Sequence, residues 1–188
     1  MNNPEEVKQN PYGMTDYKLV RRGNYYYVDK TLYIKEIENF GRYLFFIRPR
    51  RFGKSSFLSL LESYYDIYFK DQFQELFSGT WIETQPTPEQ GRYLVLSFNF
   101  SQVDSSVDKL EISFSDYIRR AIVNFLGKYD SLLAENPKRA YYCRAIEEDK
   151  NLAPADLLSN LMYLVAGSGY DLYVIIDEYD NFANTLLT

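Results

Sequence analysis

Two short segments of this sequence carry side chains whose types and spacing could act on a phosphate group. The first is a basic loop that ends in Gly53, Lys54 and Ser55. This ending is typical of a phosphate-binding P-loop, in which backbone N–H groups and the following helix N-terminus face the phosphate oxygens. Lys54 would reach the β- and γ-phosphates, and Ser55 would ligate Mg²⁺. The residues expected to bind the nucleotide are Arg48, Pro49, Arg50, Arg51, Phe52, Gly53, Lys54, Ser55 and Ser56.

The beginning of this loop departs from the usual P-loop pattern. Arg48 occupies the position of the first glycine, and a residue with a Cβ resists the positive φ that glycine adopts freely. Pro49 has no N–H to donate to a phosphate. The charges of Arg50 and Arg51 could offset these losses. Gly-Lys-Ser alone would favour a simpler interpretation, which is a helix N-terminus preceded by a basic loop.

The second segment is an apolar run that ends in two carboxylates, Asp177 and Glu178. In P-loop nucleotide hydrolases an aspartate at such a strand end holds Mg²⁺. A glutamate directly after it is well placed to polarise the attacking water as a general base. Two acids at a strand end are also common in solvated turns, so the prediction depends on both segments together. They predict Ser55 and Asp177 as metal ligands, with Lys54 and Glu178 as catalytic residues.

The spacing of apolar residues indicates the elements that must position these two segments. Continuous apolar runs predict buried strands at 43–47, 92–99 and 170–176, and a short strand at 25–28. Helical periodicity predicts helices at about 31–40, 57–68, 110–125, 138–148 and 154–165, the first ending at Gly41. This alternation predicts an α/β fold of the P-loop NTPase type, with three α/β/α layers and a mostly parallel sheet.

The composition limits the class of protein. The chain has 188 residues, of which 46% are hydrophobic and 18% aromatic, enough to bury a core. The net charge of −5 gives no global reason to expect a nucleic-acid coat protein. The absence of histidine excludes histidine-ligated metals and histidine general bases within the sequence. Cys143 is the only cysteine, and no secretory signal or long apolar span is visible, which suits a cytoplasmic protein without membrane contact.

Several segments together resemble the bacterial and archaeal AAA-ATPase-like family. They lie at residues 12–13, 16–17, 26–31, 48–55 and 177–180, so the resemblance covers essentially the whole chain. It implies that Arg48 is a family trait, that Gly53, Lys54 and Ser55 form the nucleotide loop, and that Asp177 and Glu178 form the Walker B pair. Full-length members are longer, commonly with a nuclease-like PD-(D/E)XK domain after the ATPase part, so nucleic acid is a partner only by family analogy.

The resemblance leads to expectations about domains and partners. Residues 1–40 would be a lead-in with a first helix, and residues 41–188 would be the N-terminal part of a P-loop ATPase domain that stops after the Walker B strand. The sheet would then be incomplete and would leave backbone N–H and C=O groups unpaired. We expect self-association or a C-terminal region beyond these residues to complete it.

Two hypotheses of different classes follow. The leading one is an ATP- and Mg²⁺-binding module of an AAA-like ATPase, with weak or no turnover by these residues alone. The alternative is a non-catalytic interaction or scaffold domain, which the substituted first glycine motivates. A small-molecule kinase is less favoured because the Asp-Glu pair fits ATPases better, and no Asn-Lys-x-Asp motif of a GTPase follows a strand.

Overall fold

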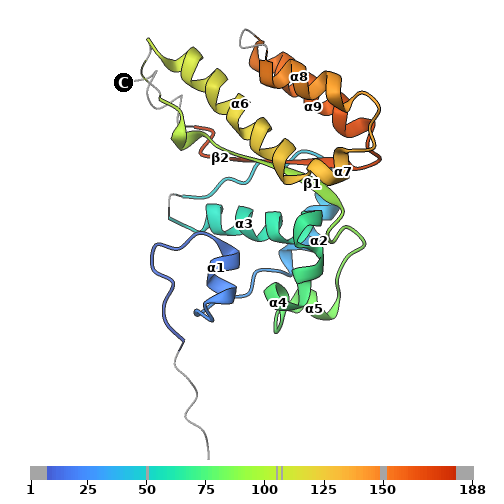
Figure 1. The fold of residues 1–188 in the computed structure, drawn as a ribbon. Helices are drawn as coiled ribbons and strands as arrows, with labels where there is room; N and C mark the ends of the chain where they lie inside the picture. Colours follow the sequence, from blue (N-terminus) through green and yellow to red (C-terminus); the bar gives the residue numbers. More distant parts are fainter. Residues whose placement is uncertain (1–7, 50, 105, 107, 149–151, 181–188) are drawn as a thin grey trace, which may run out of the picture. The chain divides into compact units, whose positions relative to one another are not determined.

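The computed structural model describes residues 8–49, 51–104, 106, 108–148 and 152–180 (Figure 1). Its contacts divide the chain into two compact units, Met1–Gly91 and Arg92–Thr188. Each unit is described by itself below. The division of the chain at residue 40 that the sequence suggests stays a prediction. No described helix is both long enough and apolar enough to cross a membrane.

The described part of the first unit is helical, with α3, Lys54–Tyr65, as its longest helix. Its other helices are α1 (Tyr17–Arg22), α2 (Tyr33–Phe40), the 3-10 helix η1 (Ile67–Gln72), α4 (Phe73–Phe77) and α5 (Trp81–Thr84). The apolar face of α3 buries Leu60 and Tyr64, and the Tyr64 and Phe77 rings lie 5.5 Å apart. The Tyr17 hydroxyl donates to Leu76 O at 2.9 Å, which joins α1 to α4. Aromatic packing around α3 therefore forms the core of this unit.

Helix α3 ends earlier than its apolar periodicity predicts. The prediction ran to residue 68, whereas α3 stops at Tyr65 because Asp66 adopts an extended conformation, with φ −71° and ψ 123°. The Asp66 carboxylate accepts a hydrogen bond from Tyr68 N at 2.9 Å and caps η1. A buried aspartate thus converts one predicted helix into a helix and a 3-10 helix.

The predicted buried strand at 43–47 is wrong. This segment is extended but pairs with no strand in the described chain, and Tyr43, Phe45 and Ile47 are 92%, 82% and 80% exposed (Figure 1, the cyan stretch before α3). The weaker prediction of a strand at 25–28 also fails, since those residues form no ladder. A strand requires a partner that accepts its backbone hydrogen bonds. No strand pairing is recorded for residues 43–47 within the described part of the chain.

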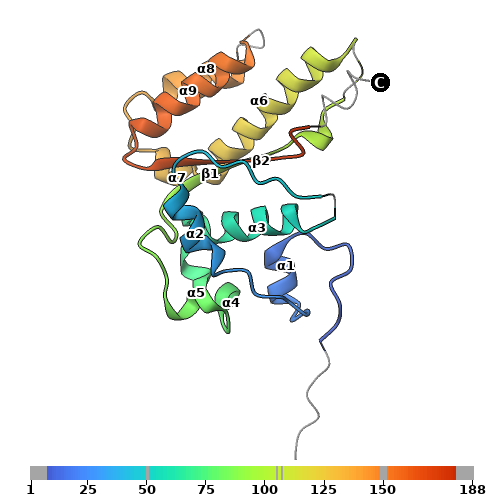
Figure 2. The same ribbon diagram turned by 180° about the vertical axis from the view of Figure 1, so that it is seen from behind.

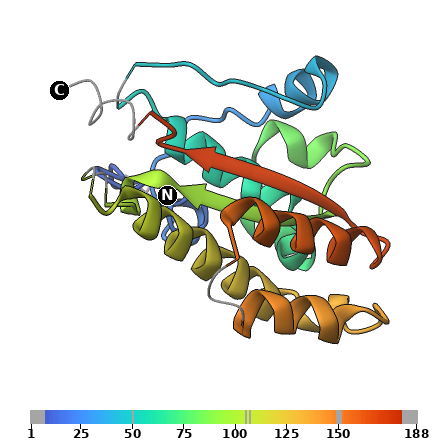
Figure 3. The same ribbon diagram turned by 90° about the horizontal axis from the view of Figure 1, so that it is seen from above.

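The second unit holds a parallel pair of strands, β1 (Tyr93–Asn99) and β2 (Asp171–Asp177). Viewed from above, the two arrows lie side by side and point the same way (Figure 3). The register pairs Tyr93 with Asp171 and Asn99 with Asp177, so the strands end together. The predicted strands at 92–99 and 170–176 are confirmed.

Helices connect β1 to β2 and cover one side of the pair. They are α6 (Leu110–Lys128), α7 (Asp130–Leu133), α8 (Arg139–Glu148) and α9 (Pro154–Ala166), and the 3-10 helix η2 (Phe100–Gln102) precedes them. α6, α8 and α9 lie on the same side of the strands in both views (Figures 1 and 2). The Tyr129 hydroxyl, at the end of α6, accepts from Val95 N at 2.9 Å and ties the helices to β1. The predicted helices at 110–125, 138–148 and 154–165 are confirmed.

The α/β class predicted from the sequence is confirmed at this level. The described residues combine helices with a parallel sheet of two strands, β1 and β2. A larger sheet with helices on both faces belongs to the proposals below.

Candidate active site

The N-terminus of α3 presents backbone donors that the described residues leave available. Gly53 precedes the helix in a left-handed conformation, with φ 76° and ψ 26°, and no side chain caps it. The first hydrogen bond of the helix runs from Phe57 N to Gly53 O at 3.0 Å. No described residue is recorded as accepting from the N–H groups of Lys54, Ser55 or Ser56. A helix start of this kind attracts anions through its N–H groups and its dipole.

Helix α1 shows what an occupied helix start looks like in the same unit. There the Asp16 carboxylate accepts from Lys18 N at 2.8 Å and from Leu19 N at 3.3 Å. α3 has the glycine that the sequence predicts for a P-loop but no such carboxylate. Its donors therefore have no recorded acceptor in the described chain, and they lie in a half-buried turn.

The loop before α3 has its tight turn at Arg51, whereas the sequence pattern drew attention to Arg48. Phe52 N donates to Pro49 O at 3.4 Å, and Arg51 has a φ of 65°. The left-handed region costs a residue with a Cβ about 1–2 kcal/mol. Arg48 is not among the described residues with positive φ, so the arginine in the first-glycine position meets no such cost. Arg50 lies outside the described residues.

Arg48 is held against the unit by an aromatic ring. Its guanidinium carbon lies 5.1 Å from the centroid of Phe46, and Phe46 lies 5.2 Å from Phe57 of α3, centroid to centroid. Phe57 is buried. The Phe46 ring therefore packs the segment before the loop onto α3, and it keeps the charge of Arg48 near the start of the loop.

Sequence reasoning missed one cation that lies beside the loop. A Cβ built on Gly53 would lie 3.3 Å from Nζ of Lys30. Lys30 comes from the segment that follows Tyr27 and precedes α2, and the only sequence signal was its place in the resemblance at 26–31. The structure thus brings together Gly53 and Lys30, which are far apart in the sequence.

The acidic pair lies in the second unit, where β2 ends. Asp177 pairs in register with Asn99 of β1, and both Asp177 and Glu178 are half-buried. Glu178 N donates to the Asp177 carboxylate at 3.0 Å. Glu178 itself has a φ of 52°. A glutamate held in the left-handed region immediately after a strand is the kind of local strain that clusters at functional sites.

The strand that carries the acidic pair has partly exposed apolar side chains. Val174 and Ile176 are 47% and 45% exposed, whereas Ile175 between them is 6% exposed. Among the described residues, the sheet contains only β1 beside β2. β2 therefore has one edge without a strand partner in that part of the chain.

The chemistry of the site residues suits a magnesium ion. The Ser55 hydroxyl and the Asp177 carboxylate are oxygen donors, which Mg²⁺ prefers. No cluster of three or more acidic or cysteine side chains is found in the described ranges. Mg²⁺ is usually held by one or two carboxylates together with substrate phosphates. Each of these two residues, one in each unit, thus has the donor type that such an ion accepts, and their joint use belongs to the proposal below.

Comparison with known proteins decides the family. The family model described as "Predicted AAA-ATPase" matches residues 11–188. The chain belongs to this AAA-ATPase-like family. Membership agrees with the resemblance of the sequence.

The comparisons add one curated relative and no solved structure. An "Uncharacterized protein in vnfD 5'region" from Azotobacter chroococcum mcd 1 is 29% identical over 180 residues, which cover 92% of this chain. This chain spans about 29% of the length of that relative. No solved structure matches the chain. The assignment of individual site residues therefore depends on the geometry above.

Proposed function

We propose that this chain is the Mg-ATP-binding part of an AAA-like P-loop ATPase. The uncapped start of α3, directly after Gly53 in its left-handed conformation, is the observation that carries the proposal. Three N–H groups and the adjacent Lys54 offer donors and positive charge of the kind that a triphosphate requires. The family match supports the same ligand.

In the proposed reaction a water oxygen attacks the γ-phosphorus in line with the bridging oxygen to the β-phosphate. The bond to that bridging oxygen breaks, ADP leaves, and inorganic phosphate forms. Lys54 and the loop N–H groups stabilise the charge that develops on the phosphate oxygens. Glu178 orients the water and accepts its proton. A magnesium ion held by Ser55 and Asp177 would neutralise phosphate charge.

We also propose that the parallel sheet is larger in the working ATPase. A further strand, from a second copy or from residues beyond this chain, would pair with the open edge of β2, and further helices would complete the three-layer fold. The half-exposed Val174 and Ile176 support this proposal. Amide hydrogen exchange tests it, because the β2 N–H groups that β1 does not pair should become protected in the assembled protein. Equally fast exchange of those groups would contradict it.

The alternative is a domain of the same fold that binds partners and has no nucleotide. Two departures from a standard P-loop motivate this alternative. Arginine replaces the first glycine, and the proline after it removes one backbone donor. If the folded chain shows no heat of binding when Mg-ATP is titrated into it, that result would support the scaffold alternative.

A single-turnover experiment tests the proposed reaction. The chain is kept in excess over radiolabelled ATP with Mg²⁺, so that even slow cleavage is counted. We expect labelled phosphate to form and Glu178→Gln to prevent it while leaving ATP bound. Asp180→Asn, an acid just beyond the pair, is the matched control and should leave the rate within a few-fold. Equal rates for Glu178→Gln and the unchanged chain would overturn the role of Glu178.

A further inference from the structure

We propose that Lys30 is a second phosphate-binding cation of the α3 site. The inference deepens the proposed function and rests on it. Its ligand is the polyphosphate of a nucleoside di- or triphosphate. In this arrangement the Lys30 ammonium faces the Gly53 end of the loop, and Lys54 enters from the helix that follows.

The position of Lys30 relative to the loop is the first observation. Its Nζ lies 3.3 Å from the point that a Cβ on Gly53 would occupy. Gly53 is where the backbone of a P-loop comes closest to phosphate, because the missing side chain leaves that room. An oxygen bound over Gly53 would therefore meet the Lys30 ammonium within the usual 2.7–2.9 Å range of a charge-assisted hydrogen bond.

The backbone of Lys30 is fixed by its two neighbours. Asp29 accepts through one carboxylate oxygen from Trp81 N at 2.7 Å and through the other from Thr31 N at 2.8 Å. Thr31 is fully buried, and its hydroxyl accepts from Ile82 N at 3.1 Å. Asp29 and Thr31 thus clamp the start of α5, and Lys30 lies between them.

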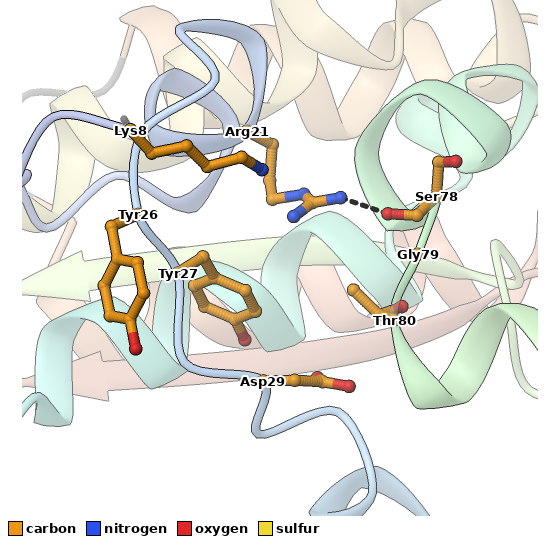
Figure 4. A pocket seen from close by; sticks show the side chains of 8 residues that line it. All are labelled: Lys8, Arg21, Tyr26, Tyr27, Asp29, Ser78, Gly79 and Thr80. Carbon is orange, nitrogen blue, oxygen red and sulfur yellow. Dashed lines mark hydrogen bonds between the residues drawn. The ribbon is translucent and has the colours of Figure 1, made fainter. Parts of the chain in front are cut away.

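One residue of the clamp, Asp29, also lines a neighbouring hollow. Asp29 lines that hollow with Arg21, Tyr27 and Thr80 (Figure 4), and the Arg21 guanidinium donates to Ser78 O there. Lys30 is not part of its lining. The Lys30 N–H donates to the Tyr27 hydroxyl at 3.4 Å, and the Lys30 C=O accepts from Tyr33 N at 3.2 Å. With both backbone groups engaged, the side chain of Lys30 is directed to the loop from a constrained position.

The Lys30 ammonium has no recorded counter-ion among the residues that the structure describes. No carboxylate in those ranges forms a salt bridge with it, and the same holds for Lys54. By contrast, Lys18 in the same unit lies 3.4 Å from Glu62. Two half-buried lysines and an uncapped helix start therefore concentrate positive charge around Gly53. An anion with several charges is the ligand that would balance them.

Calorimetric titration of the chain with magnesium-free tripolyphosphate and with Mg-ATP tests Lys30. The first probe has no base or sugar, so it isolates contacts to phosphate. Lys30→Gln should lower the affinity for both ligands about ten- to hundredfold, which is the range expected when a charge-assisted hydrogen bond is lost. Lys30→Arg, which keeps the charge, should recover part of this loss. The melting temperature should stay unchanged, because the ammonium contacts no recorded partner in the described chain.

The matched control is Lys35→Gln, a charge removed from the same unit. The Lys35 ammonium donates to Gln85 at 3.0 Å and lies 4.8 Å from the Trp81 ring centroid, so it has partners of its own. Lys35→Gln should leave the affinities for tripolyphosphate and Mg-ATP within about twofold of those of the unchanged chain. If Lys54→Ala abolishes binding and Lys30→Gln leaves it intact, the role of Lys30 is refuted while the proposed function stands. If the unchanged chain, folded, binds neither probe, both proposals are refuted.

Discussion

The two candidate segments, the loop before α3 and the acidic pair after β2, follow apolar runs that behave in opposite ways. Residues 171–177 form β2, which pairs in register with β1 and ends at Asp177. Residues 43–47 are also an apolar run, yet they pair with no strand in the described chain and lead into the loop before α3. The difference indicates that local helix geometry shapes the loop before α3. The position of the acidic pair depends instead on the pairing of β2 with β1, which is distant in the sequence.

Because of this contrast, we expect substitutions in the loop and in the strand pair to have different effects. The loop conformation depends on Gly53, on the turn at Arg51 and on the packing of Phe46 against Phe57. The acidic pair depends on the ladder between β1 and β2 and on the burial of Ile175. Substitutions in the ladder should therefore weaken the fold of the second unit, while substitutions in the loop should mainly change ligand binding.

The largest expected effect is in the ladder. Ile175→Ala should lower the free energy of unfolding by about 2–4 kcal/mol, because it removes a buried side chain and leaves a cavity. Ile176→Ala makes the same change at the next position, where the side chain is 45% exposed, and should cost less than about 1 kcal/mol. Urea unfolding followed by circular dichroism measures both. Equal losses would break the comparison, because the two side chains would then be buried to the same degree.

A smaller effect is expected at the loop. Gly53→Ala puts a Cβ at a φ of 76°, and this strain should cost about 1–2 kcal/mol of stability. The new methyl also enters the space beside Lys30, so ATP affinity should fall more than tenfold. Gly13→Ala is a control with a similar φ of 76° and open space around it. It should show the strain without the loss of ATP affinity. Unchanged ATP binding by Gly53→Ala would show that phosphate does not approach Gly53.

The smallest effect concerns the backbone at the acidic pair. Glu178→Gly relieves a φ of 52° and should stabilise the fold by up to about 1 kcal/mol, while removing the proposed general base. Glu135→Gly, at an exposed glutamate without positive φ in the same unit, should destabilise by roughly 0.5–1 kcal/mol. Thermal unfolding compares the two. A destabilised Glu178→Gly would mean that Glu178 makes contacts that outweigh its strain.

The elements set by local periodicity were predictable from the sequence. The apolar spacing located α3, α6 and α9, and Gly53 marked the start of α3. The runs at 92–99 and 170–176 were predicted as strands, and β1 and β2 confirm them.

Features that depend on distant contacts could not be predicted in this way. Whether residues 43–47 pair is decided by a partner strand, which an apolar run does not specify. The approach of Lys30 to Gly53 depends on two hydrogen bonds that its neighbours accept, Asp29 from Trp81 N and Thr31 from Ile82 N. The positive φ of Arg51, rather than of Arg48, follows from the turn closed between Pro49 and Phe52.

The central claim is that the start of α3 binds nucleotide phosphate, and calorimetry with Mg-ATP tests it most directly. The unchanged chain and Glu178→Gln should bind with similar affinity, because Glu178 acts on water and not on the nucleotide. Lys54→Ala should bind roughly a hundredfold more weakly, since it removes a charged hydrogen bond to phosphate, and it should unfold at the same temperature. Equal binding by Lys54→Ala and the unchanged chain, or no binding by the folded chain, would contradict the account.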